Sequence, residues 1–366
     1  MNRVRVKQQR LLARRLAARR TAWVAVLCIV MLAAFASVQA ASGKNTTAAS
    51  KGHIVVASYG GAYAAAQTKA YFNPFTKTTG ISVFQTTDSG YPKAQAQESA
   101  HNVVWDVTSA DGGSFAQEVS NHLLQKLDFS RINTKNIDSA VVNRYGVGYI
   151  EYSDVMAWNK AKYGNNLTPA DFFNTTKYPG KRILPSDPQA TLEFALLADG
   201  VSPSKLYPLD VDRAIAKIKS IKSSIVGFKG GSDSETFVSQ GEADMAFMPN
   251  GRIADAIKNG APWAYTWQDG ILFTEYWAVM KGAPHLNSAM NFINFAIQAK
   301  QQAALANAIP YGPTNSKALP LLSTSLQKAL PSYPANRKQQ VLFNAAWWVP
   351  NAPKVQDKWN ALTLGG

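Results

Sequence analysis

The sequence predicts an α/β protein with two lobes. The chain has 366 residues, 46% of them apolar, which exceeds the size at which one hydrophobic core is usual. A β-rich run at 53–58 is followed by glycines, an Ala-rich helix and a second strand at 81–86. Strands that alternate with helices in this way pair in parallel. A second set of strands and helices begins at Thr168, so we expect two such units.

Residues 1–40 have the pattern of a secretory signal peptide. Eight Lys and Arg residues in the first twenty precede an uncharged segment, 21–39, that ends in small residues. A membrane anchor is the alternative, although the segment is barely long enough to span a bilayer. The single cysteine, Cys28, lies in this segment, so the exported chain would have no disulfide. A flexible linker is expected at 41–52.

The charge and the motif content argue against several function classes. The chain has 38 basic and 23 acidic residues, and without the eight basic residues of the leader the net charge falls from +15 to +7. That charge, spread over a large exported domain, gives no indication of nucleic-acid binding. There is no Gly-x-Ser-x-Gly or His-Glu-x-x-His motif, and the four histidines lack ligand spacing. We expect no enzyme activity, no metal and no cofactor; an exported hydrolase or an adhesin is the remote alternative.

The candidate ligand-binding carboxylate lies in the apolar stretch 270–281. With the two-residue period of a strand, Ile271, Phe273, Glu275, Trp277 and Val279 share one face, which places the acid between two aromatic residues. An unpaired buried carboxylate costs several kcal/mol or becomes protonated. We therefore expect a ligand's ammonium group as its partner. The alternatives are an edge strand with the carboxylate in water, or a structural ion pair with an arginine.

Arg252 is the candidate partner for an anionic group. A strand at 243–248 is followed by Asn250, which is expected to cap a helix ending at Gly260, and Arg252 falls in its first turn. A cation there opposes the helix dipole, at a cost of roughly 0.3 to 1 kcal/mol. A carboxylate held by Arg252 and the free N–H groups would offset that cost. The alternative is an arginine that extends to solvent.

Three turns between strands and helices carry further candidates. Gly60 and Gly61 follow the first strand and would let backbone N–H groups approach a ligand, unless they form an ordinary turn. Asp111 is expected to cap the helix after the third strand or to face a ligand. Asp187 is expected to cap a helix that runs to Asp199.

Ten short motifs occur in one order along residues 53–362. They begin at Ser58 (SYGGAY), Pro74 (PFTKTTGI), Trp105 (WDVTSAD), Leu123 (LLQKLD), Tyr178 (YPGKR), Ala195 (ALLADGV), Tyr207 (YPLDVDRA), Pro249 (PNGRI), Asn291 (NFINFA) and Tyr311 (YGPTN). In these motifs the chain resembles the periplasmic solute-binding proteins of ABC importers, in the spermidine/putrescine group.

The resemblance implies the two-lobed type II periplasmic-binding-protein fold, with two crossing hinge segments and a C-terminal helical tail. Lobe 1 would comprise 53–152 and 278–310, lobe 2 would comprise 153–277, and 311–366 would pack on both. The crossings would lie near 151–157, in a β-rich segment of two extended runs broken by Ser153-Asp154, and near 277–281.

The resemblance also implies how such a protein works. The lobes would close on a small-molecule ligand and then dock on an ABC permease in the inner membrane. The protein would be periplasmic, monomeric and without a nucleic-acid partner.

The resemblance assigns roles to individual residues. It implies a binding tyrosine at Tyr63, a cleft-lining turn at Asp111, an amine contact at Asp187, an aromatic–acid pair at Phe273 and Glu275, and a polar contact at Trp348. Two departures concern the same site. Ala190 replaces a second expected acid, and Gly60 and Pro249 stand where polyamine binders keep stacking tryptophans.

The predicted ligand is a small amine such as putrescine or spermidine. A long polycation needs carboxylates at both ends and aromatic faces along its methylenes, and the departures remove part of both. Arg252 favours the alternative, a zwitterion such as 4-aminobutyrate or an opine-like amino compound, with Glu275 at the opposite end of the pocket. The residues do not decide between these two classes.

Overall fold

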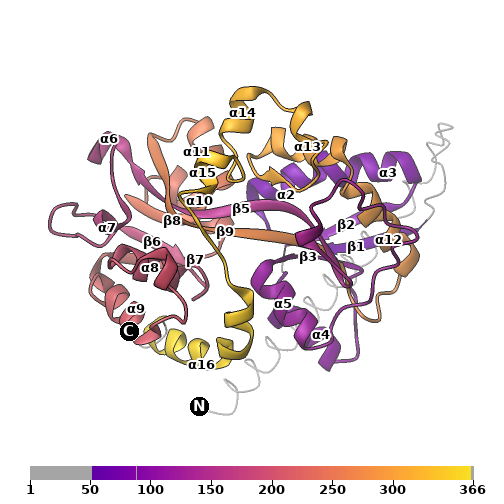
Figure 1. Ribbon diagram of the computed structural model, residues 1–366, viewed down its shortest axis with the longest axis horizontal. Coiled ribbons are helices and arrows are strands. Elements are labelled where there is room, and N and C mark those ends of the chain that lie inside the picture. The colour runs from indigo at the N-terminus through magenta and orange to yellow at the C-terminus, as the bar shows by residue number, and fades with distance from the viewer. Residues whose placement is uncertain (1–51, 88, 364–366) are drawn as a thin grey trace, which may run out of the picture. The chain divides into compact units, whose positions relative to one another are not determined.

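The computed structural model describes residues 52–87 and 89–363, which form a mixed β-sheet covered by helices (Figure 1). The expected signal peptide, 1–40, and the linker up to residue 51 lie outside the described residues. The strands are β1 His53–Ala57, β2 Ser82–Thr86, β3 Val107–Asp111, β4 Val142–Asn143, β5 Gly146–Asn159, β6 Arg182–Pro185, β7 Ile225–Lys229, β8 Met245–Pro249, β9 Trp263–Val279, β10 Gly312–Pro313 and β11 Val341–Leu342.

The strand order divides the sheet into two halves. The order is β2-β1-β3-β9-β5-β8-β6-β7, and we call the β2-β1-β3 half lobe 1 and the β8-β6-β7 half lobe 2. The parallel pairing of β1 with β2 is confirmed, and β6 likewise pairs in parallel with β7 and β8. β9, the next strand after β3 in the sheet, runs antiparallel to it. This arrangement confirms the α/β fold of type II that the resemblance implies.

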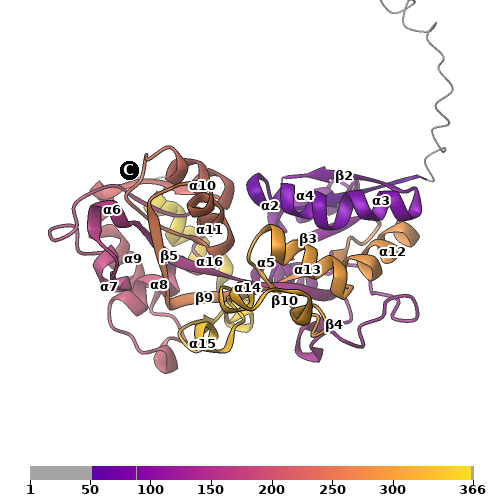
Figure 2. The same cartoon turned by 90° about the horizontal axis from the view of Figure 1, so that it is seen from above.

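Two long strands, β5 and β9, run through both lobes (Figure 2). They pair antiparallel from Gly146 with Ala278 to Asn159 with Trp263. The expected break at Ser153-Asp154 is absent; β5 continues there with a shift of register against β9. At the expected second crossing, near 277–281, β9 pairs with β3 of lobe 1 as far as Val279. The exact lobe boundaries remain a prediction, since both strands continue unbroken.

Helices cover both faces of the sheet (Figure 1). Short 3-10 turns are η2 Ser139–Val141, η3 Pro203–Lys205, η4 Lys222–Ser224 and η5 Leu319–Leu321, and a π-helical turn, η1 Thr68–Phe72, joins α2 to α3. The α-helices are α2 Gly61–Gln67, α3 Asn73–Thr79, α4 Tyr91–Ser99, α5 Gly112–Ser120, α6 Lys160–Tyr163, α7 Pro169–Phe172, α8 Thr191–Ala198, α9 Val211–Lys219, α10 Gly231–Ser239, α11 Asn250–Lys258, α12 Leu286–Ala296, α13 Ala299–Ala308, α14 Thr324–Lys328, α15 Pro334–Arg337 and α16 Ala345–Thr363.

Alternate residues of each strand belong to different cores. In β1, Ile54 and Val56 pack with Phe292 of α12, whereas Ala57 packs with Phe115 of α5. In lobe 2, Phe247 of β8 stacks on Phe194 of α8, with ring centroids 4.1 Å apart. Both faces of the sheet are therefore buried, as is usual where helices cover a parallel sheet on both sides.

The C-terminal segment is less uniformly helical than expected. Besides α14 to α16 it supplies β10, which pairs with β5, and β11, which pairs with β9. Trp359 of α16 donates a hydrogen bond from Nε1 to the Ser186 carbonyl at 2.8 Å, which attaches the helix to lobe 2. Among the described residues, no helix has both the length and the apolar character needed to cross a membrane.

Three predicted helix starts have different outcomes. Asp111 caps α5, with Oδ1 accepting from Gly113 N at 2.8 Å and Ser114 N at 3.0 Å, so this prediction is confirmed. Asp187 does not cap α8, because that helix begins at Thr191 after Ala190, whose φ is 62°. Asn250 is the first helical residue of α11 and makes no cap.

The stacked pair in lobe 2 gives a stability prediction. Phe247→Ala should lower the free energy of unfolding by about 3–5 kcal/mol, because it leaves a cavity beside Phe194 in a fully buried layer. Phe84→Ala is the matched control, since Phe84 is 58% exposed on β2 and its loss should change stability by no more than about 0.5 kcal/mol. Urea denaturation measures both. Equal effects would contradict this assignment of the core.

Candidate ligand-binding site

A cavity of about 280 Å³ lies between the lobes, where the carboxyl ends of several strands meet. We call it the Arg252 compartment. The β1–α2 turn contributes Tyr59, α2 contributes Tyr63, and β9 contributes Glu275. From lobe 2 come Lys229 at the end of β7 and Arg252 of α11. Ligands of α/β proteins commonly bind at such a crevice between elements.

The carboxylate of Glu275 is buried and receives hydrogen bonds from three hydroxyl groups. Glu275 is 3% exposed. Its Oε1 accepts from Tyr149 OH at 2.8 Å, from Tyr63 OH at 3.1 Å and from Ser109 Oγ. The predicted burial is confirmed, so the alternative of a carboxylate in water is wrong, and in the described part of the chain no arginine forms an ion pair with Glu275. The carboxylate nevertheless does not depend on a ligand for its partners, because the protein supplies them.

Burial also sets the protonation of Glu275. Desolvation raises its pKa to about 7, although hydrogen bonds from Ser109 and Tyr149 act to lower it. Its second oxygen, Oε2, has no hydrogen-bond partner among the described residues. The group therefore keeps one oxygen for a donor in the cavity, and a cation there would favour its ionised form.

The donors to Glu275 are themselves held by packing. Tyr149 stacks on Trp277, with ring centroids 4.2 Å apart and an interplanar angle of 14°. Gln67 of α2 donates from Nε2 to Tyr149 OH at 3.1 Å. Ser109 reaches the site because it pairs with Trp277 across β3 and β9. Sequence reasoning missed Ser109 and Tyr149, because their positions beside Glu275 depend on how β3 and β5 each pair with β9.

Arg252 lies across the interface between the lobes. It is 4% exposed, which excludes the alternative of a solvated side chain. Its Nη1 donates to the carbonyl of Gly60 at 2.9 Å and lies 3.4 Å from Glu235 Oε2. Its Nε and Nη2 have no hydrogen-bond partner among the described residues. The guanidinium lines the cavity and keeps two donor groups for a ligand.

Glycines make room for this guanidinium. A Cβ on Gly61, whose φ is +68°, would lie 2.8 Å from Arg252 Nη1, and a Cβ on Gly231 would lie 2.5 Å from its Nε. Gly60 and Gly61 thus serve the contact between lobes, and neither is among the residues that line the compartment. The expected approach of their N–H groups to a ligand is replaced by a carbonyl that accepts from Arg252.

Three further carboxylates line the cavity. Asp111 is held as the α5 cap and also accepts from Tyr59 OH at 3.1 Å. Asp154 of β5 is 8% exposed, and its Oδ1 has no hydrogen-bond partner among the described residues. Burial, together with the charges of Asp111 and Asp187, raises the pKa of Asp154 to about 7. Asp187 has an exposed side chain within the cavity, where desolvation by the surrounding walls raises its pKa.

A second compartment, of about 340 Å³, adjoins the first. We call it the Gln189 compartment; its own lining includes Ser89, Ser114, Gln189 and Phe273. Phe273 stacks on Tyr152, with centroids 5.2 Å apart and an interplanar angle of 9°. The residues that line both compartments, which we call the waist, are Tyr59, Asp111, Tyr152, Asp154, Pro185 and Asp187.

Six of the ten predicted site residues line the two compartments: Tyr63, Asp111, Asp187, Arg252, Phe273 and Glu275. Their contact with a ligand remains a prediction. Asn250 is instead buried, with Oδ1 accepting from Ser153 N at 3.0 Å and Nδ2 donating to the Pro310 carbonyl at 2.9 Å. Trp348 is 1% exposed and donates from Nε1 to Glu193 Oε1 at 2.6 Å, so it belongs to the core of lobe 2.

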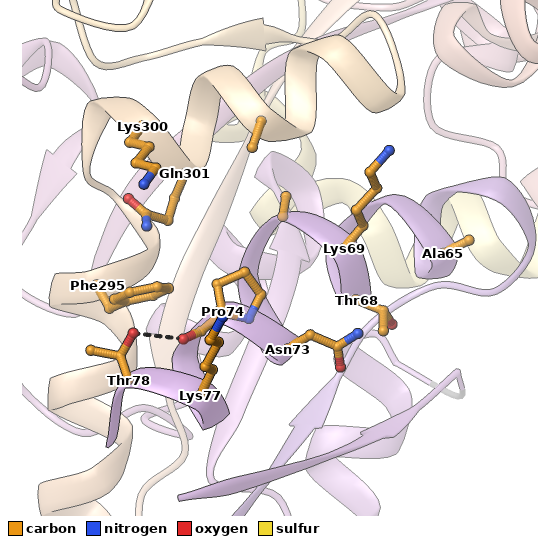
Figure 3. Close-up of a pocket in the computed structure, with 12 residues that line it drawn as sticks. Ala65, Thr68, Lys69, Asn73, Pro74, Lys77, Thr78, Phe295, Lys300 and Gln301 are labelled. Carbon is orange, nitrogen blue, oxygen red and sulfur yellow. Dashed lines mark hydrogen bonds between the residues drawn. The ribbon is translucent and has the colours of Figure 1, made fainter. Parts of the chain in front are cut away.

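A larger pocket, of about 800 Å³, lies on lobe 1 between the α2–α3 segment and α13 (Figure 3). Lys69, Lys77 and Lys300 are among its lining residues, and no carboxylate is. Such a surface would repel an amine. No group of three His, Cys, Asp or Glu residues in the described chain has the arrangement of a metal site.

Comparison with known proteins places the chain in a family. Residues 70–338 match the family described as bacterial extracellular solute-binding protein. The gamma-aminobutyric acid-binding protein of Pseudomonas aeruginosa is 35% identical over 316 residues, which cover 84% of this chain and 90% of that protein. The putrescine-binding periplasmic protein SpuD of P. aeruginosa is 23% identical, over 74% of this chain and 81% of its own length.

Solved structures give the same result. The structure of AgtB from A. tumefaciens R10, in complex with agropinic acid, is 47% identical and superposes with a TM-score of 0.84. The match covers 86% of this chain and 99% of that one. The similarity therefore extends over both lobes.

The raised pKa of Glu275 gives a prediction about stability and pH. The pKa of Glu275 in the folded protein, about 7, lies above the ordinary value of 4.5. Between pH 4.5 and pH 7, folding is therefore accompanied by protonation of this carboxylate. The contribution of protonated Glu275 to the free energy of unfolding is fully present below pH 4.5. It is lost as the pH rises to 7, and the loss is roughly 3 kcal/mol at most. Glu275→Gln should therefore gain stability relative to the unsubstituted protein over this interval. Urea denaturation midpoints of both proteins, measured from pH 4 to 8, test this. Midpoints that change with pH in parallel for the two proteins would contradict the prediction.

Proposed function

We infer the ligand class from one premise: the chain belongs to the bacterial extracellular solute-binding proteins, the substrate-binding components of ABC transporters. We propose that it captures a small amino-carboxylate, such as 4-aminobutyrate or an opine-like amino compound, rather than a polyamine. The observation that carries this proposal is Arg252, a buried guanidinium that lines the cavity with Nε and Nη2 unengaged.

The two ends of such a ligand have matching groups in the cavity. Arg presents N–H donors in a geometry that fits both oxygens of a carboxylate. Glu275 and the carboxylates of the waist would receive the ammonium group, whose charge would keep them ionised. The names of the more similar relatives, a gamma-aminobutyric acid-binding protein and a protein in complex with agropinic acid, support this class.

A diamine is the second candidate. Four carboxylates line the Arg252 compartment: Asp111, Asp154, Asp187 and Glu275. They would attract a dication. Arg252 and Lys229 line the same space, however, and would repel its second ammonium group. Ala190 stands in place of an expected acid and is fully buried, so this position supplies no negative charge to offset the repulsion by Arg252 and Lys229.

The transport setting follows from the family and from the leader. A protein exported by residues 1–40 would act in the periplasm as a monomer and deliver its ligand to a permease of the inner membrane. The contacts between the lobes, Arg252 with Gly60 and Glu235 with Ala62 N at 3.5 Å, would form when the lobes close.

A thermal-shift comparison tests the ligand class. 4-Aminobutyrate at 100 times its Kd should stabilise the protein by about 2.7 kcal/mol. Arg252→Gln should weaken its binding by roughly 10- to 100-fold, because charge-assisted bonds to the carboxylate are lost. Lys229→Gln is the matched control in the same cavity and should have a smaller effect.

Putrescine separates the two candidates. It has no carboxylate, so we expect it to bind the unsubstituted protein weakly and to lose nothing in Arg252→Gln. If putrescine binds more tightly than 4-aminobutyrate, or loses as much affinity in that variant, the amino-carboxylate proposal is wrong.

A further inference from the structure

Two histidines meet in lobe 1, where β1 begins beside α12 (Figure 1). His53 is the first residue of β1, and His285 directly precedes α12, the helix that packs against β1. Their ring centroids are 4.5 Å apart, and the rings are tilted by 56° rather than stacked. Neither residue lines the Arg252 compartment or the Gln189 compartment, so the pair is separate from the candidate ligand-binding site.

Asp106 holds the ring of His285 in a defined orientation. The Asp106 side chain is fully buried, and its Oδ2 accepts from Val55 N at 2.8 Å and from His285 Nδ1 at 3.1 Å. A neutral imidazole that donates from Nδ1 has its lone pair on Nε2. Nε2 of His285 has no hydrogen-bond partner among the described residues and is not buried. This nitrogen is therefore both oriented and accessible.

The ring nitrogens of His53 are also free. They have no hydrogen-bond partner among the described residues and are not buried, although the residue is only partly exposed. The ring lies between that of His285 and that of Phe84 on β2, whose centroid is 5.2 Å away. The two histidines thus offer imidazole nitrogens from two separate elements. Imidazole is the commonest metal ligand among protein side chains.

The distance between the two rings fits a shared metal ion. An ion bound to two imidazole nitrogens at about 2.0–2.1 Å would place the ring centroids roughly 4.5–5.2 Å apart, for N–metal–N angles of about 90–110°. The observed separation of 4.5 Å agrees with this range. A metal-bound histidine commonly donates its other N–H to a carboxylate, as His285 does to Asp106. No Lys or Arg in the described chain pairs with Asp106, so a dication on His285 would bring positive charge close to this buried carboxylate.

We propose that His53 and His285 together bind one divalent transition-metal ion, and that Asp106 orients His285 from outside the coordination shell. The two imidazoles are the protein's ligands, and water completes the coordination. Nitrogen ligands favour Cu²⁺ over Zn²⁺, and they disfavour Mg²⁺ and Ca²⁺, which prefer oxygen. The ion would join the start of β1 to the start of α12 and so stabilise lobe 1. The proposal is independent of the small molecule that binds between the lobes.

Calorimetric titration of the chain from residue 41 to 366, without an affinity tag, tests the proposal. Omitting the leader also removes Cys28, whose thiol could itself bind metal. One Cu²⁺ or one Zn²⁺ should bind per chain, Cu²⁺ more tightly than Zn²⁺, and excess Mg²⁺ should not compete. In protein labelled with nitrogen-15 histidine, Zn²⁺ should shift the imidazole signals of His53 and His285 and leave those of His101 and His122 in place.

Single substitutions identify the ligands. His53→Asn and His285→Asn should each weaken Zn²⁺ binding by roughly tenfold or more, because one of the two protein ligands is lost. His101→Asn and His122→Asn are the matched controls, since both side chains are exposed on turns, and they should leave the affinity unchanged. Asp106→Asn should weaken binding by roughly 10- to 100-fold, as is usual for a group that orients a metal ligand.

Three results would overturn the proposal. The first is a Kd for Zn²⁺ weaker than about 1 mM in the unsubstituted protein. The second is binding that persists unchanged when His53 and His285 are both replaced by Asn. The third is a shift of the His101 or His122 signals instead of the other two, which would mean that the metal binds at scattered surface histidines. The titration and the spectra of the unsubstituted protein do not depend on how the Asp106→Asn variant folds.

Discussion

The buried carboxylate of Glu275 is the interaction around which the lobe 1 wall of the cavity is organised. A carboxylate removed from water needs hydrogen-bond donors, and here they come from three separate elements: Tyr63 of α2, Ser109 of β3 and Tyr149 of β5. The donors on β3 and β5 reach Glu275 because β9 lies between these two strands and pairs antiparallel with both. The strand order of the fold and the polarity of the site are therefore parts of one arrangement.

Arg252 couples the site to the contact between the lobes. Its guanidinium belongs to lobe 2, but its Nη1 donates to Gly60 of lobe 1. The same side chain lines a cavity that both lobes form, and its Nε and Nη2 have no hydrogen-bond partner among the described residues. A ligand carboxylate bound there would be attached to the group that also joins the lobes, so binding would favour the closed arrangement over an open one. The small side chains of Gly61 and Gly231 are needed for this packing.

Family membership and ligand choice depend on different parts of the chain. The family match extends over 269 residues, 70–338, and the two lobes superpose on solved relatives. The balance of charge in the cavity, in contrast, depends on a few side chains, such as Arg252, Lys229 and Asp154. A resemblance to polyamine binders can therefore identify the fold and the transport role without determining the class of ligand. Similarity to relatives named for amino-carboxylates is greater than to one named for putrescine.

The sequence by itself determined the α/β fold, the buried strand around Glu275, the Asp111 cap and the position of Arg252 at the start of a helix. These features follow from local periodicity and from neighbouring residues along the chain. Only the tertiary structure decided what Glu275 and Asp154 contact, because Ser109, Tyr149 and Glu275 are brought together by strand register, which no local spacing specifies. It likewise moved Trp348 and Asn250 out of the site, since their polar atoms bond to core groups distant in sequence.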